Sequence, residues 1–101
     1  MEAIGASEAF RIAKEISQVP DWTFTIAFYP YSRAKGVASN QLTIKEGCTW
    51  RKQLPSDKFS INADNYFLFT DGEGNPRMCY RVLVRFMIFP DTNKPTKLLH
   101  V

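Results

Sequence analysis

Histidine and cysteine, which build many catalytic and metal sites, are scarce in this sequence. Its 101 residues include one histidine, His100, and two cysteines, Cys48 and Cys79, which match no Cys-x-x-Cys or Cys/His ligand spacing. No motif places a nucleophile or an orienting acid with His100, and no glycine-rich phosphate loop or pair of catalytic carboxylates is visible. We therefore expect a protein that is not an enzyme and has no metal or cofactor, although an active site assembled from distant positions would leave no local signature.

Long hydrophobic runs are also missing. No stretch of about 18 apolar residues occurs, so no transmembrane helix is predicted. The first eight residues lack the basic start and long apolar core of a secretion signal. These absences predict a cytoplasmic protein with no membrane contact. In that compartment Cys48 and Cys79 are expected to be small, buried, reduced residues, and a disulfide between them cannot be argued from the sequence.

Aromatic residues are plentiful by contrast. Eight Phe, four Tyr and two Trp can fill a single core, and the length predicts one domain over residues 1–101. The net charge of +3 is unevenly spread. Two basic against four acidic residues give residues 1–32 a charge of −2, and eleven against six give residues 33–101 a charge of +5. A basic body of this size permits contact with nucleic acid or an acidic partner but does not require it.

The N-terminal segment, residues 1–20, contains a helical pattern. Apolar residues recur at helical spacing between Ser7 and Ser17, Ser7 is suited to cap the helix, and Pro20 ends it. A helix of about eleven residues is marginal alone in water, so it needs a surface to lie on. We expect it to cover one face of a sheet; binding of a partner along its apolar face is the alternative.

The remainder, residues 21–101, is predicted to be an antiparallel β body. Strand-like segments are expected at Trp22–Tyr29, Asn40–Glu46, Lys58–Ile61, Asn65–Thr70, Met78–Phe89 and Thr96–Val101. The predicted fold class is therefore α+β, mostly β, with one N-terminal helix packed on a five- or six-stranded antiparallel sheet or small open barrel.

Three details of this β body can be tested. Turn formers from Asp71 to Pro76 predict a hairpin between two of the strands. In the segment Asn40–Glu46, alternation predicts that Leu42 and Ile44 point inward. Gly47 then permits a bulge or bend.

The segment Met78–Phe89 is predicted to be one long strand. Arg77, Arg81 and Arg85 then stand on the same face, each roughly 13 Å from the next by strand rise. Such an arginine ladder could follow a phosphate backbone or an acidic partner. A structural role is favoured, in which the arginine stems cover apolar neighbours on a solvated sheet face, because Leu83 and Met87 between the cations indicate partial burial.

The loop after the first predicted strand mixes rings and cations. Tyr29, Tyr31, Arg33 and Lys35 lie within a few residues of Gly36. Nucleic-acid binders use this mixture, because rings stack on bases and cations meet phosphates. A protein interface or an inert exposed turn would also explain it, and no RNA-binding consensus is present.

A longer-range pattern carries a resemblance. It runs Gly47-Cys48, Arg51, Leu54-Pro55, Asn65 to Asp71, Gly74-Asn75-Pro76 and Cys79-Tyr80-Arg81. Over roughly residues 22–89 it resembles short uncharacterised proteins of bacterial phages and integrated mobile elements. The resemblance implies a setting, which includes association with a virion, and brings no catalytic residues to transfer.

The leading functional prediction is a non-enzymatic interaction or structural module. It would associate with itself, as a homo-oligomer, or with another protein, because an aromatic sheet with exposed edges and faces favours association. The alternative is a nucleic-acid-binding module that uses the aromatic–basic loop and the arginine ladder, that is Tyr29, Tyr31, Arg33, Lys35, Arg77, Arg81 and Arg85.

Overall fold

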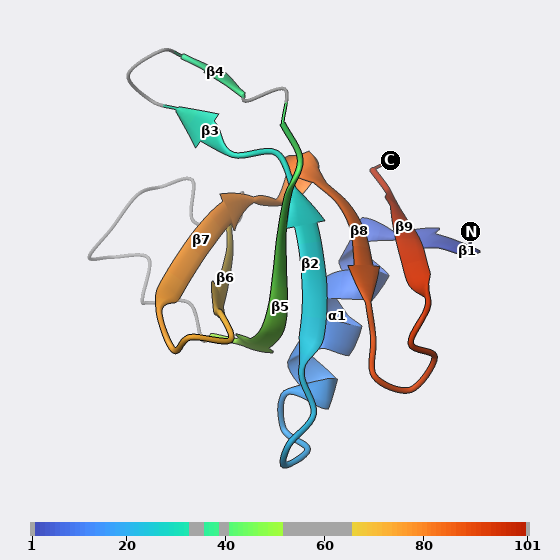
Figure 1. The fold of residues 1–101 in the computed structure, drawn as a ribbon. Coiled ribbons are helices and arrows are strands. Elements are labelled where there is room, and N and C mark those ends of the chain that lie inside the picture. The colour runs from blue at the N-terminus through green and yellow to red at the C-terminus, as the bar shows by residue number, and fades with distance from the viewer. Residues whose placement is uncertain (1, 33–35, 39–40, 52–65, 101) are drawn as a thin grey trace, which may run out of the picture.

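The computed structural model describes residues 2–32, 36–38, 41–51 and 66–100. Within them, seven strands form one open sheet with a single helix packed against it, which confirms the mostly β, α+β class (Figure 1). The main elements are β1 (Glu2–Gly5), α1 (Ala6–Ile16), β2 (Phe24–Phe28), β5 (Thr43–Trp50), β6 (Tyr66–Thr70), β7 (Pro76–Tyr80), β8 (Val84–Ile88) and β9 (Pro95–Leu99). Two short strands, β3 (Tyr31–Ser32) and β4 (Val37–Ala38), pair separately at the top of Figure 1.

The main sheet is mixed. Its strand order is β1-β9-β8-β2-β5-β6-β7, in which β1 runs parallel to β9 and the other pairs are antiparallel. The prediction of five or six strands, all antiparallel, is therefore wrong in number and in direction. The number differs because β7 and β8 were predicted as one strand and β1 was not predicted. The four residues of β1 are too few to show an alternating pattern, and their partner lies at the other end of the chain. The predicted strand Lys58–Ile61 lies outside the described residues.

The helix lies where the sequence predicts it. Its apolar stripe of Ala9, Phe10, Ala13 and Ile16 is buried against the sheet. The predicted cap is wrong: Gly5, not Ser7, precedes the first turn, because the chain enters α1 directly from β1. At the other end, the Ser17 hydroxyl donates to the Ala13 carbonyl at 2.7 Å and accepts from the Trp50 amide at 2.7 Å. This serine joins the end of α1 to the end of β5.

A bulge in β5 decides which of its residues are buried. Gly47 has a φ of 66°, and the pairing with β2 shifts by one residue at this point, as predicted for a bulge. Beyond the bulge Cys48 is fully buried and Trp50 packs against the core. Before it Ile44 is 52% exposed and Leu42 is also exposed. The prediction that Leu42 and Ile44 point inward is wrong, because the bulge changes the phase of the alternation.

The long strand predicted over Met78–Phe89 is broken in two. A 3-10 turn at Arg81–Leu83 separates β7, the last strand in the sheet order, from β8, which lies beyond β2, β5 and β6. An unbroken strand that buries Cys79 and Met87 would place Arg81 on the same face, and burying a charge costs several kcal/mol. The turn resolves this conflict. It leaves Val82 62% exposed, and a second bulge at the start of β8 leaves Arg85 exposed.

Phenylalanines from three elements meet in the core. The centre of the Phe67 ring in β6 lies 4.8 Å from the centre of the Phe10 ring in α1 and 6.0 Å from the centre of the Phe24 ring in β2. Cys48 and Cys79 belong to the same core as buried free thiols, as predicted. Burial is the main cause that raises the pKa of each thiol to about 12. Both cysteines therefore act as packing residues at neutral pH.

Candidate functional site

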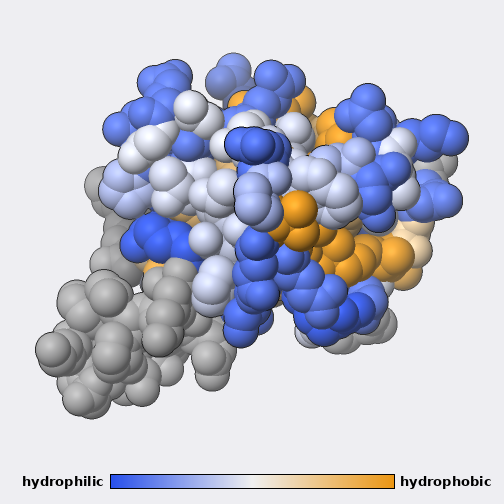
Figure 2. All heavy atoms as spheres, turned by 90° about the horizontal axis from the view of Figure 1, so that it is seen from below, coloured by the Kyte–Doolittle hydropathy of each residue, from blue (hydrophilic) through white to orange (hydrophobic). Residues whose placement is uncertain are grey.

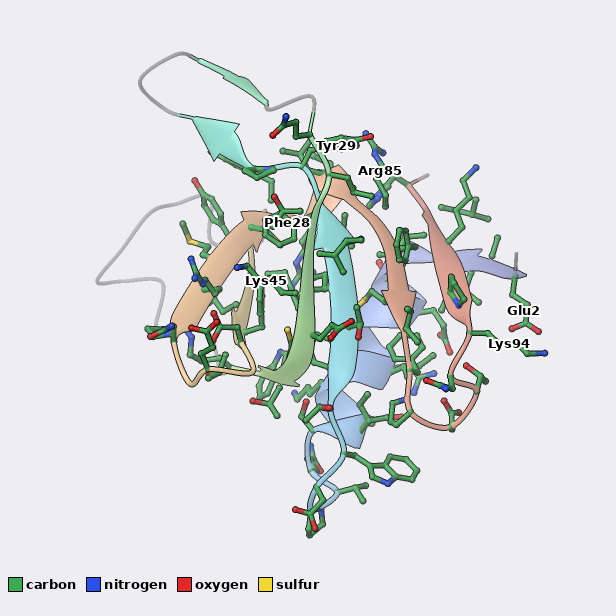
Figure 3. The ribbon with its side chains drawn as sticks, in the orientation of Figure 1. Glu2, Phe28, Tyr29, Lys45, Arg85 and Lys94 are labelled. Carbon is green, nitrogen blue, oxygen red and sulfur yellow. The ribbon has the colours of Figure 1, made fainter. Side chains whose placement is uncertain are left out.

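The predicted site residues do not form one surface. Because β7 and β8 are far apart in the sheet, the arginine ladder does not exist. The guanidinium of Arg77 donates from Nε to Asp71 Oδ2 at 2.8 Å. That of Arg85 lies 5.4 Å from the centre of the Tyr29 ring, and Figure 3 shows the two side chains together near β3 and β4.

The structure describes two of the four residues of the predicted aromatic–basic loop, Tyr29 and Tyr31. Tyr29 meets Arg85, which links the start of the predicted loop to one predicted arginine. The backbone of Tyr31 belongs to β3. Arg33 and Lys35 lie outside the described residues, so their prediction is untested.

The third arginine, Arg81, lines a groove that the sequence analysis did not foresee. This groove, here called the α1–β5–β6 groove, has a volume of about 310 Å³ and lies between the helix and the neighbouring ends of two strands. Four cations and several rings line it. The residues are Ser7, Phe10, Arg11, Lys14, Trp50, Arg51, Tyr66, Phe67, Leu68 and Arg81. Among these described lining residues there is no carboxylate.

One of the four cations is neutralised locally. Arg11 binds Glu8 one turn before it and Glu15 one turn after it, the latter at 2.6 Å. These hydrogen bonds, that with Glu8 first, raise the pKa of the Arg11 guanidinium. Arg11 therefore adds little net charge to the groove.

The other three cations have no acidic partner in the described part of the chain. The ammonium of Lys14 lies 5.0 Å from the centre of the Trp50 ring. The guanidinium of Arg81 lies 5.2 Å from the centre of the Phe10 ring, and its Nε donates to the Tyr66 carbonyl at 3.1 Å. Each ring attracts the cation above its face without removing its charge. The rings thus position Lys14 and Arg81 at the groove.

Arg51 completes this set. Its backbone amide donates to the Leu68 carbonyl at 3.1 Å, which fixes its position beside β6. Its Nη2 donates to the Arg77 carbonyl at 3.0 Å. Its Nε is buried and has no hydrogen-bond partner within the described residues. A buried donor without a partner costs roughly 1–3 kcal/mol, and more when it is charged, so this atom calls for an explanation.

A second cavity, of about 500 Å³, lies beside the β6–β7 turn. Three acidic residues line it, Glu46, Asp71 and Glu73. Asp71 holds the turn together: its Oδ1 accepts from the amides of Glu73 and Asn75 at 3.0 Å, and its Oδ2 accepts from Arg77. These bonds, that from Arg77 first, lower the pKa of Asp71. Within the described residues, no three His, Cys, Asp or Glu side chains gather into a cluster that could hold a metal ion.

Part of the groove could have been found in the sequence. Ser7, Phe10, Arg11 and Lys14 are spaced as one stripe along a helix, at the edge of its apolar face. No sequence signal says which strands lie opposite this stripe, because β5 and β6 are brought there by tertiary packing.

The chain was compared with models of known protein families, with curated proteins and with solved structures, and none of the three comparisons finds a match. In the described part of the chain, no helix has both the length and the apolar character needed to cross a membrane.

Proposed function

We propose that this protein is a non-enzymatic interaction module that binds a negatively charged partner in the α1–β5–β6 groove. The observation that carries the proposal is that Lys14, Arg51 and Arg81 line one groove without a carboxylate among its described lining residues. Cations gathered without counter-charges in a concave surface create a positive potential that attracts anions. Arg11, which also lines the groove, and Arg77, which does not, are both in ion pairs and add little to this potential.

The groove favours charge recognition over base stacking. A nucleobase would need an open ring face, and the cations of Lys14 and Arg81 already lie over the faces of Trp50 and Phe10. The nucleic-acid alternative relied on the aromatic–basic loop, of which Arg33 and Lys35 lie outside the described residues, and on an arginine ladder that the fold does not contain. Nucleic acid therefore remains a candidate partner only as a source of negative charge, here or near Tyr29 and Arg85.

Tryptophan fluorescence can test the proposal. Trp22 is exposed and does not line the groove, so a Trp22→Phe protein reports on Trp50 alone. Titration with tripolyphosphate should change the Trp50 emission, because an anion that binds Lys14 alters the charge above the ring. Binding should weaken in high salt, which screens the attraction. Adding Lys14→Gln should weaken binding several-fold, whereas Lys97→Gln, an equal charge change at an exposed position of β9, should not. Equal effects of the two variants would contradict the proposal.

Self-association is the second candidate function. It is supported by large apolar side chains that are exposed in the single chain: Met78 on β7 at 51%, Val82 in the turn after β7 at 62%, and Ile44 on β5. A separate group of hydrophobic residues is visible in Figure 2, which looks at the end of the molecule that carries the α1–β2 connection; it lies toward the side of β8 and β9, away from β7. A homo-oligomer would also suit the phage or mobile-element setting that the sequence resemblance implies.

A further inference from the structure

We propose that the group recognised in the α1–β5–β6 groove is a phosphate monoester on a small organic molecule. This inference rests on the proposed function and goes beyond it by naming the ligand chemistry. Three basic residues, Lys14, Arg51 and Arg81, line this one small groove. Their positive charge is best balanced by a ligand group that carries more than one negative charge on a few atoms. A phosphate monoester carries about −1.5 to −2 charges at neutral pH, whereas a carboxylate or a phosphodiester carries one.

The compactness of the cation cluster argues against a nucleic-acid backbone. A backbone spreads its charges along a line, which an extended ladder of arginines would follow. The fold places Lys14, Arg51 and Arg81 around one groove of about 310 Å³ instead. That volume is at the lower end of small-molecule pockets, which span roughly 300–1,000 Å³.

The hydrogen-bond donors suit phosphate oxygens. Arg81 uses its Nε to hold the Tyr66 carbonyl, and no described residue accepts from its two Nη groups. Paired N–H groups of a guanidinium bind two oxygens of one phosphate or carboxylate, and such charge-assisted bonds are about twice as strong as neutral ones. The Nε bond therefore holds the Arg81 guanidinium in place, and its two Nη groups are available to bind two oxygens of one ligand group.

Arg51 supplies a second reason to expect an anion. Its unpaired Nε is a cost that the protein bears without a ligand. If the Arg51 side chain turns toward an anion in the groove, this donor gains an oxygen acceptor. Binding would then relieve that cost, which favours an oxygen-rich ligand group at this position.

The remaining walls suit the carbon part of the ligand. Trp50 and Leu68 are only partly buried and present apolar surface beside the cations. The buried rings of Phe10 and Phe67 form the adjoining core. A ligand with a ring or a short carbon chain would fill this side of the groove.

Phenyl phosphate and phenyl sulfate form a matched test pair, because they share shape but differ by about one charge at neutral pH. Calorimetry at pH 7.5 should show phenyl phosphate binding about tenfold more tightly. The advantage should shrink at pH 5, because the second phosphate pKa is about 6 and the ligand loses its extra charge. The groove itself is lined by no described Asp, Glu or His. The carboxylates of Glu8 and Glu15 are bound by Arg11, which lines the groove.

Two variants separate binding from folding. Lys14→Gln changes an exposed helix residue and should weaken phenyl phosphate binding about tenfold, with the melting temperature little changed. Arg81→Lys keeps the charge but loses the bidentate edge, and should also weaken binding. Lys97→Gln is the charge-matched control. His100→Gln controls for the histidine, whose Nε2 lies 2.7 Å from the Val84 carbonyl, outside the groove lining.

The outcomes distinguish the proposal of anion binding in the groove from the narrower proposal of a phosphate monoester as the ligand. If tripolyphosphate binds through Lys14 but phenyl phosphate binds no better than phenyl sulfate, the monoester inference is wrong and the anion-binding function stands. Tighter Lys14-dependent binding of a short single-stranded oligonucleotide without a terminal phosphate would replace the monoester with a nucleic-acid backbone. If none of these anions binds, both proposals fail.

Discussion

At the scale of single residues, Asp71 organises the turn between β6 and β7. Its side chain is buried, accepts two backbone amides within the turn and pairs with Arg77 at the start of β7. The neighbouring Gly72 allows the turn to pack against β5. Its amide donates to the Glu46 carbonyl at 3.1 Å, and a Cβ at residue 72 would lie only 2.8 Å from that oxygen. The turn formers noted in the sequence thus have specific tertiary partners.

The lowered pKa of Asp71 predicts a pH dependence of stability. The folded protein holds this carboxyl group's proton less tightly than the unfolded chain, whose pKa is near 3.8. The stabilisation is therefore fully present above that value and is lost as pH falls through the lower, folded pKa. Thermal unfolding of wild type and Asp71→Asn between pH 2 and pH 7 checks this. The variant should melt lower at pH 7, and the difference should shrink in acid. The same pH profile in Asp71→Asn, or an equal loss in the exposed neighbour variant Glu73→Gln, would refute it.

At the scale of elements, the positions of breaks and bulges decide which residues of each strand are buried and which strands are neighbours. The helix, the β6–β7 hairpin and the bulge at Gly47 follow from local patterns of spacing and turn residues. The division of Met78–Phe89 into β7 and β8 does not, because both halves have strand-like sequence. It depends on keeping arginines out of a core that Cys79 and Met87 enter. The arginine ladder was predicted from the four-residue spacing of the arginines along one unbroken strand. Because the strand is divided, the fold does not contain that ladder.

The contact between α1 and β6 should be critical for stability. Phe67 is buried and its ring meets those of Phe10, Phe24 and Phe69. Phe67→Ala should lower the free energy of unfolding by about 3–5 kcal/mol, through lost burial and the cavity left behind. Met78→Ala on the neighbouring strand, whose side chain is half exposed, should cost less than about 1 kcal/mol. Urea unfolding of the two variants measures both values, and comparable losses would show that the rings do not form the core described.

At the scale of the whole molecule, an open sheet is covered by one helix. The sequence allowed the α+β class and the helix's apolar face to be predicted. It did not allow the strand order, because β1 and β9 come from opposite ends of the chain. The α1–β5–β6 groove was not predicted for the same reason. Its stripe of residues on α1 can be found from local spacing in the sequence, but Trp50, Arg51 and Arg81 are brought beside that stripe by contacts between distant parts of the chain. The balance of +5 over residues 33–101 permitted an anionic partner but did not require one, and it did not place a site.

The oligomeric state tests the second candidate function at this scale. If the exposed apolar residues of β7 and its following turn form an interface, light scattering behind size exclusion should give a mass above that of one 11.6 kDa chain. This mass should persist in high salt, since burial of apolar surface is not screened. Val82→Lys should convert the oligomer to a monomer, whereas Lys97→Gln should not. A wild-type monomer at all concentrations and salts would exclude this function.

The most direct test of the central claim is to locate an anion on the protein. We would titrate ¹⁵N-labelled protein with tripolyphosphate and follow the backbone amide signals by NMR. The account predicts saturable shifts centred on Lys14, Trp50, Arg51 and Arg81, with little change on β9. Shifts centred instead on Tyr29 and Arg85, or small shifts spread over every exposed lysine and arginine, would contradict the claim that the α1–β5–β6 groove is the binding site.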